Sequence, residues 1–144
     1  DPSTVIHFFG TKEGLFQAVI ADMSEITEPV FSALEQGYSG EKLMRTYLEI
    51  WENKEANAAM SALIRAAFES EKTMLLFREA ITSRFVNVAK KQTKDALDAE
   101  ILIMQIVIMG MGRHLVGLPE LSKSSITTIS NRVGSLLNNL MSKT

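Results

Sequence analysis

Hydrophobic residues recur at helical spacing along most of this chain. The clearest stripe consists of Leu43, Met44, Tyr47, Leu48 and Trp51. Residues three or four positions apart share one face of a helix, so this stripe predicts an amphipathic helix with a buried side. Similar stripes occur at 60–68, 75–88 and 126–141. Because β-branched residues do not alternate with polar ones as they do in half-buried strands, we expect an all-α fold.

Turn and capping residues divide this pattern into successive helices. Thr11 can cap a helix that Pro29 kinks or interrupts. The glycines at both ends of 37–40 indicate a turn before the next helix. Ser122 or Ser124 can cap the last helix.

The segment 101–118 differs from the others because it has almost no polar face. Such a helix is expected to be covered on nearly all sides. Gly110 and Gly112 lie inside this apolar run and do not follow a strand, so they do not form a nucleotide-binding loop. We expect these small residues to let another helix approach closely.

Composition limits the function more than it defines it. The chain has 144 residues, 46% of them hydrophobic, no cysteine and a net charge of −2. It fits one compact domain. Because the net charge is slightly negative, any contact with nucleic acid must be confined to a local part of the surface. The longest uncharged stretch, 101–112, is too short to cross a bilayer, so we expect a soluble protein.

Candidate chemistry is sparse. His7 and His114 are far apart in sequence and lack carboxylates at metal-ligand spacing, and no carboxylate pair stands out as acid and base. We therefore predict no metal, no cofactor and no enzymatic activity. Eight methionines and ten aromatic residues are spread over the helices. They could form a solid core or line an adaptable apolar cavity, and the residues alone leave both interpretations open.

The N-terminal residues carry a family resemblance. The segment PSTVIHFFGTKEGLFQAVI, residues 2–20, resembles the end of the helix-turn-helix in the TetR (tetracycline-repressor) family of transcription regulators. In that family a short recognition helix runs through an aromatic pair into a turn, and K-E-x-L opens the next helix. The segment IMGMGRHLVGLPEL, residues 108–121, is similar to the penultimate helix and following turn of one subgroup.

The resemblance implies a division at residue 16, with the end of the DNA-binding domain at 1–16 and a ligand-binding and dimerisation domain at 17–144. The residues that it places on DNA are Ser3, Thr4, His7 and Lys12. Ile6 stands where the family usually has a tyrosine that reaches a phosphate, so backbone anchoring is weaker or lies elsewhere. A recognition helix also needs a preceding helix that sets its angle on the DNA, so the complete DNA-binding domain is expected to include residues before Asp1.

The resemblance further implies a homodimer in which helices 97–118 and 122–142 pair with their copies as a four-helix bundle. The interface residues expected on the last helix are Ile126, Ile129, Val133, Leu136, Leu137 and Leu140. The residues expected to line an effector cavity are Tyr47, Trp51, Met60, Phe77, Phe85, Met104 and Ile108. The implied protein is a cytoplasmic repressor whose affinity for a double-stranded DNA operator is relieved by a small, largely apolar effector. The alternative is a helical interaction and dimerisation domain without an effector, which would have a solidly packed interior.

Overall fold

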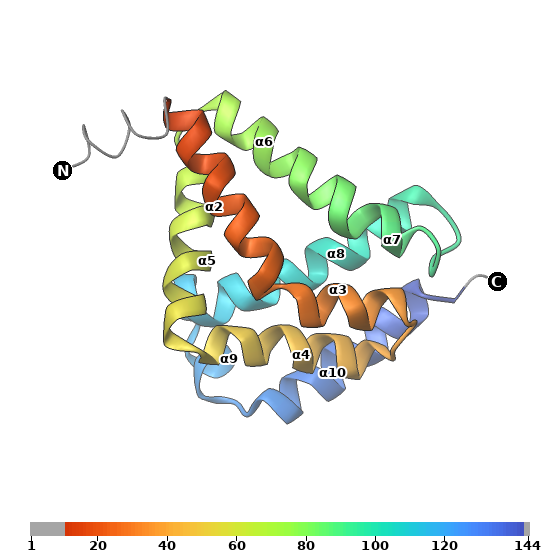
Figure 1. The fold of residues 1–144 in the computed structure, drawn as a ribbon. Coiled ribbons are helices and arrows are strands. Elements are labelled where there is room, and N and C mark those ends of the chain that lie inside the picture. The colour runs from red at the N-terminus through yellow and green to blue at the C-terminus, as the bar shows by residue number, and fades with distance from the viewer. Residues whose placement is uncertain (1–10, 143–144) are drawn as a thin grey trace.

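The computed structural model describes residues 11–142, and every regular element among them is a helix (Figure 1). The α-helices are α2 (Lys12–Ile26), α3 (Glu28–Glu35), α4 (Gly40–Glu52), α5 (Lys54–Ala67), α6 (Glu71–Ile81), α7 (Asn87–Ala89), α8 (Ala96–Met111), α9 (Pro119–Lys123) and α10 (Ile126–Leu140). Two π-helical turns, η1 (Thr82–Val86) and η2 (Gly112–Val116), extend α6 and α8. The predicted all-α fold is confirmed.

Side-chain caps define where most of these helices begin. The predicted cap Thr11 is confirmed, because its hydroxyl accepts a hydrogen bond of 2.9 Å from the Gly14 N–H. The corresponding caps of α4, α5, α6 and α8 are Ser39, Asn53, Ser70 and Asp95. Pro29 lies in the first turn of α3, which is where the chain leaves α2. The predicted interruption at this proline is therefore also confirmed.

The start of the last helix differs from the prediction. Ser125, and neither Ser122 nor Ser124, caps α10 by accepting a hydrogen bond of 3.1 Å from the Thr128 N–H. The short helix α9 follows Pro119 and occupies the preceding residues. The Ser122 hydroxyl instead donates to the Arg113 carbonyl at 2.9 Å.

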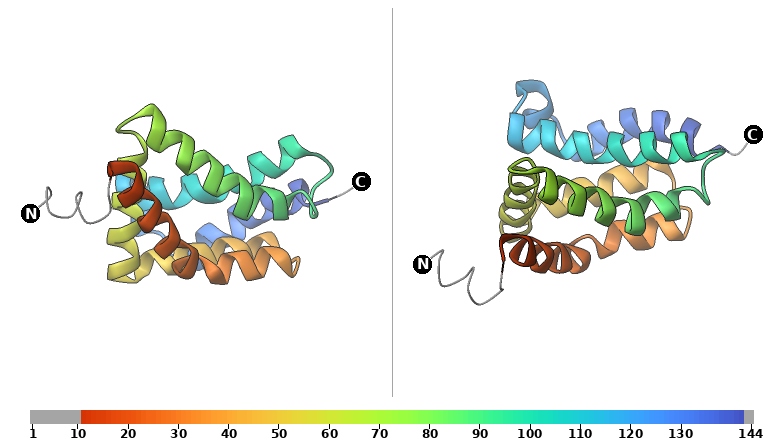
Figure 2. Two further views of the ribbon diagram at one scale, coloured as in Figure 1. Left: turned by 45° about the horizontal axis from the view of Figure 1, so that its top comes forward. Right: turned by 90° about the horizontal axis from the view of Figure 1, so that it is seen from above.

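The helices stack in layers (Figure 2). Seen from above, α8 and α10 lie along one side, α2 and α3 along the other, and α4 and α6 between them. Helix α4 packs most extensively against α10. A Cβ on Gly40 would collide with the Gly134 backbone, and one on Gly134 with the Glu41 backbone, so both glycines are needed for this close crossing. The Asn138 amide oxygen also accepts a 2.7 Å hydrogen bond from the Gly40 N–H.

This packing corrects part of the predicted dimer interface. Ile129 and Leu137 of α10 are 6% and 0% exposed because they fill the chain's own core against other helices. They are therefore not available to a partner subunit. Leu136 is 59% exposed, and Ile126, Val133 and Leu140 are half-buried.

Helix α8 is not covered on all sides within this single chain, and its coverage on nearly all sides stays a prediction. Its inner face is buried, but an outer stripe is exposed at Leu97, Ile101, Met104 and Ile108. Among the described residues, the continuous helix Ala96–Val116 is the one segment long and apolar enough to span a membrane by length and composition. A core helix of a soluble protein has the same properties, and one face of α8 packs against α4, α7 and α10 here.

Candidate functional site

A cavity of about 210 Å³ lies among α2, α4, α5, α6, η1 and α8. Most of its wall is apolar. The apolar side chains that form its body include Ile20, Met23, Tyr47, Met60, Leu63, Ile64, Phe77, Phe85, Ile103, Ile106 and Val107. The interior of the domain is therefore not packed solid, and the open space is suited to an apolar molecule.

An external groove adjoins this cavity between α2 and α6. Ile20, Ala80 and Ser83 line both the groove and the cavity. The groove continues outward along Gln17 and Leu76. A small molecule could therefore reach the cavity between these two helices.

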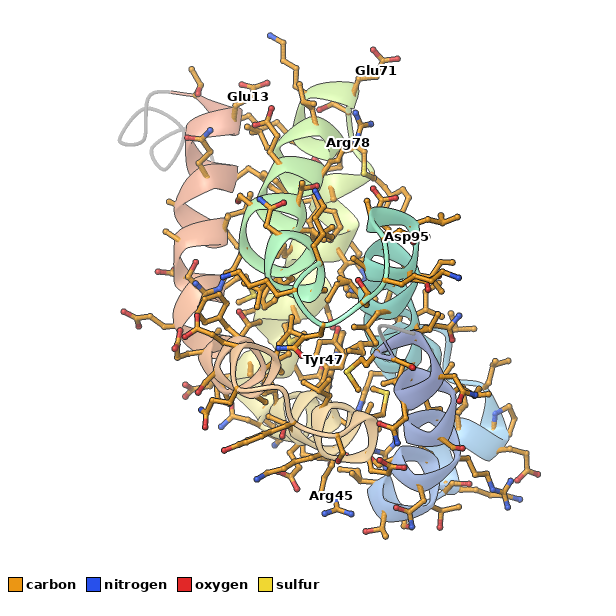
Figure 3. All side chains as sticks on the ribbon, turned by 90° about the vertical axis from the view of Figure 1, so that its right-hand side faces the viewer. Glu13, Arg45, Tyr47, Glu71, Arg78 and Asp95 are labelled. Carbon is orange, nitrogen blue, oxygen red and sulfur yellow. The ribbon has the colours of Figure 1, made fainter. Side chains whose placement is uncertain are left out.

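Tyr47 brings one polar group to the mainly apolar wall. Figure 3 shows Tyr47 inside the bundle of helices, whereas Arg45, two residues earlier on α4, points away from it. Burial raises the pKa of Tyr47 to about 12, and the neighbouring Trp51 opposes this shift. The phenol is consequently neutral over the physiological pH range.

Arg84 on η1 is the one cation among the cavity-lining residues. Its Nη2 donates to the Ser24 carbonyl at 2.8 Å and to a carboxylate oxygen of Glu28 at 2.7 Å. The guanidinium carbon lies 4.5 Å from the centre of the Phe31 ring. Its Nε is buried and has no hydrogen-bond partner among the described residues. Arg84 thus connects the junction of α2 and α3 to η1 and retains an unused donor.

The structure places four of the seven predicted effector-binding residues at this cavity: Tyr47, Met60, Phe77 and Phe85. Trp51, Met104 and Ile108 do not line it, which corrects the predicted lining. Met104 and Ile108 are 43% and 48% exposed on the outer face of α8, because the helix turns its other face to the core. That the cavity binds a ligand stays a prediction.

Trp51 lies instead in a filled part of the interior. It is 1% exposed, and its indole stacks on the His114 ring with 5.0 Å between the ring centres and 3° between the planes. A Cβ on Gly110 would collide with the Trp51 indole and with the Tyr47 ring. This confirms the predicted structural role of Gly110, since the glycine allows α8 to pack directly on α4.

Sequence reasoning missed Arg84 and the α2 residues Ile20 and Met23. The two apolar residues belong to an ordinary helical stripe, which does not distinguish a cavity wall from a filled core. Arg84 owes its position to η1, where the wider π-turn changes which side chains face inward. No residue pattern in the segment signalled this turn.

Of the predicted DNA-binding residues, the structure describes only Lys12. Ser3, Thr4 and His7 lie outside the described residues. Lys12 opens α2 and forms a salt bridge of 2.6 Å with Glu69, and this contact raises the pKa of Lys12. Both side chains are about half exposed, so this pair is weak and the ammonium group remains accessible to a phosphate. Helix α2 is continuous across the domain division predicted at residue 16.

The family is decided by a match over most of the chain. The family model for the tetracyclin repressor-like C-terminal domain matches residues 38–141. This chain belongs to the TetR family. A TetR-family regulator from Streptomyces coelicolor A3 has a similar crystal structure, with a TM-score of 0.68 and 25% sequence identity. The similarity covers 98% of this chain and 76% of that one. No curated protein matches the sequence.

TetR membership gives the coarse function. The chain has the fold of a transcriptional regulator, and nothing in the matched family model or in the regulator from Streptomyces coelicolor A3 indicates enzymatic activity. Within residues 11–142, no three His, Asp or Glu side chains come together as a metal site would require. The largely apolar cavity is a candidate site for binding a small molecule.

Proposed function

We propose that this chain is the effector-binding and dimerisation part of a cytoplasmic TetR-family repressor, and that a small, largely apolar effector in the cavity lowers operator affinity. The observation that carries the proposal is that one helix adjoins the segment predicted to bind DNA and also lines the cavity. Helix α2 begins next to the segment that resembles a recognition helix and supplies Ile20 and Met23 to the cavity wall. A ligand that contacts α2 can therefore bias the position of the DNA-binding end.

The cavity favours this proposal over a helical interaction domain without an effector. That alternative requires an interior filled by methionine and aromatic side chains. Met60, Phe77 and Phe85 instead surround open space. The interaction-domain alternative therefore has less support from the packing.

A melting experiment tests the effector proposal. A chemically diverse panel of apolar, aromatic and cationic compounds should include some that raise the melting temperature of the 144-residue chain. Ala80→Leu adds bulk to a residue shared by groove and cavity, so it should remove the shift. Ala62→Leu, on the exposed face of α5, makes the same substitution away from the cavity and should keep it. A panel without effect, or equal shifts in both variants, would argue for the interaction domain.

The homodimer proposal rests on the exposed apolar stripe of α8. Leu97, Ile101, Met104 and Ile108 follow one another at intervals of four, three and four residues, which is the spacing of a helix-pairing seam. The exposed Leu136 adds α10 to the same proposal. Such a contiguous stripe on a soluble chain favours contact with a second copy, because water would otherwise cover it. The interface we propose is thus centred on α8 more than the sequence predicted.

Charged substitutions on this stripe test the dimer. The double variant Met104→Glu, Ile108→Glu should elute as a monomer in size-exclusion chromatography with light scattering, because each new carboxylate would be buried against its copy. Leu136→Glu should weaken the dimer less. Ala62→Glu is the control, since this exposed residue lies on α5. A monomeric unsubstituted chain, or an unchanged dimer in the double variant, would exclude this interface.

A further inference from the structure

The polar groups of the cavity are concentrated on one side. Ser24 lies in the last turn of α2, Thr27 directly follows that helix, and Ser83 and Arg84 come from η1. The lining residues that α5 and α8 contribute are all apolar. The cavity is therefore amphipathic, with a polar edge and an apolar body.

Arg84 is the one charged side chain among the described residues that line the cavity. Its partner carboxylate, Glu28, does not line the cavity, and Glu79 lines only the adjoining groove. A cationic ligand inside the cavity would therefore meet a guanidinium and no carboxylate among these described lining residues. A ligand with a negatively charged group would meet a guanidinium already held in place by the Ser24 carbonyl and the Phe31 ring.

The binding capacity of Arg84 is only partly used. Both of its hydrogen bonds to the described residues come from Nη2, and the buried Nε has no partner among them. The partner carboxylate, Glu28, is 58% exposed, so water weakens its interaction with Arg84.

We propose that the ligand is an amphipathic carboxylic acid, with its carboxylate on Arg84 and its hydrocarbon body between Phe77 and the apolar residues of α8. This inference rests on the proposed effector function of the cavity. A volume of about 210 Å³ lies below the range of roughly 300–1,000 Å³ that is usual for drug-sized ligands. The cavity therefore favours a short or medium-length hydrocarbon chain over a long one.

Three probes with hydrocarbon chains of nearly equal length and different head groups test this proposal. Decanoate, decanol and decyltrimethylammonium are titrated into the 144-residue chain by calorimetry, below the micelle-forming concentrations of the two charged compounds and the solubility limit of decanol, at a pH where the acid is ionised. Decanoate should bind about tenfold more tightly than decanol, because the ionised carboxylate adds ionic attraction to its hydrogen bond with Arg84, whereas the alcohol oxygen accepts as a neutral group. The ammonium compound should bind most weakly.

Substitutions at the polar edge assign the preference to Arg84. Arg84→Gln should reduce the affinity for decanoate to that for decanol and leave decanol binding unchanged. The matched control is Arg78→Gln, which removes a cation from an exposed position of α6 (Figure 3) and should keep the preference. Glu28→Gln should strengthen decanoate binding, because it removes a competing carboxylate from the guanidinium. Circular dichroism of each variant identifies any loss of fold, and Glu28→Gln provides a test that does not require Arg84 to be replaced.

The outcomes separate this inference from the proposed function. Decanol that binds as tightly as decanoate, or a preference for decanoate that survives Arg84→Gln, would overturn the carboxylate assignment and leave an effector cavity in place. Failure of all three probes to bind, together with a compound panel that leaves the melting temperature unchanged, would overturn both. If none of the three probes binds but other compounds of the panel do, only the assignment of the ligand as an amphipathic carboxylic acid is overturned.

Discussion

Tyr47 and Trp51 lie one turn apart on α4, and both are almost fully buried, yet their surroundings are opposite. Their ring centres are 6.5 Å apart, with 72° between the planes. Tyr47 borders the cavity. Trp51 is enclosed by α8 and by the stacked ring of His114. A single helix thus presents one aromatic residue to open space and the next to close packing.

Whether an aromatic residue of α4 lines the cavity depends on how closely α8 packs against it. Helix α8 approaches Trp51 closely because Gly110 has no side chain. One turn earlier, α8 presents Ile106 and Val107, which help to line the cavity. Substitutions in the filled region should therefore affect stability most, whereas those around the cavity should affect ligand binding most.

Truncating the two α4 aromatic residues should give the largest contrast. Trp51→Ala should lower the free energy of unfolding by about 3–5 kcal/mol, because the indole is contacted on all sides and its removal leaves a new void. Tyr47→Ala should cost roughly 1 kcal/mol less, because one side of that ring already borders open space. Urea denaturation followed by far-ultraviolet circular dichroism measures both. Equal losses would show that the cavity region is packed as tightly as the Trp51 region.

Two neighbouring glycines test the close approach of α8 with the same substitution. Gly110→Ala should destabilise the fold by about 1–3 kcal/mol, because the new methyl group would meet two rigid aromatic rings. Gly112→Ala is the matched control. Its Cβ would lie 3.0 Å from the flexible end of the Leu121 side chain, which can move aside. Alanine also favours helix, so the control should cost far less or stabilise slightly, by about 0.5 kcal/mol.

A larger loss from Gly112→Ala than from Gly110→Ala would show that η2, and not the contact with α4, limits this part of the fold. Thermal and urea unfolding of the two variants side by side distinguishes these cases.

The sequence was sufficient for the helices, because capping residues and apolar stripes are local signals, and the resemblance of residues 2–20 pointed to the family. Thr11 and Pro29 mark boundaries that the structure confirms. The sequence was not sufficient to predict which face of α8 is buried. A nearly all-apolar helix has no polar side to orient it, so Met104 and Ile108 were predicted inside although they are exposed. Which face turns inward depends on Gly110 and on the residues of α4 that it meets.

The cavity was predictable only in part for a similar reason. Tyr47, Met60, Phe77 and Phe85 belong to stripes that any core would need, and the pattern cannot show that space remains between them. For Ile129 and Leu137 the error was the opposite one, because residues predicted at the surface are part of the core. They were predicted at a dimer interface, but α10 uses them inside its own chain because paired glycines let it pack closely on α4.

The smallest expected effect is a pH dependence that originates beside Trp51. The Asn57 amide donates to Nδ1 of His114 at 3.3 Å, and Ser61 holds that amide by donating to its oxygen. Nδ1 is therefore the acceptor, and the neutral ring carries its proton on Nε2. Burial lowers the pKa of His114, the neighbouring Arg113 lowers it further, and Glu52 opposes both. Protonation of the ring is thus less favourable in the folded state than in the unfolded state.

The sign of the effect follows from this lowered pKa. Below the ordinary histidine pKa of about 6.5, the unfolded chain takes up a proton that the folded chain resists, so stability falls as the pH decreases. The urea midpoint of the unsubstituted chain should therefore be lower at about pH 5.5 than at about pH 7.5, and His114→Gln should reduce this difference. His7→Gln, which removes the other histidine, is the control and should retain it. If the urea midpoint changes with pH by the same amount in the unsubstituted chain and in His114→Gln, the ring takes up its proton as easily in the folded state as in the unfolded state. The region around Trp51 would then be more open to water than its packing indicates.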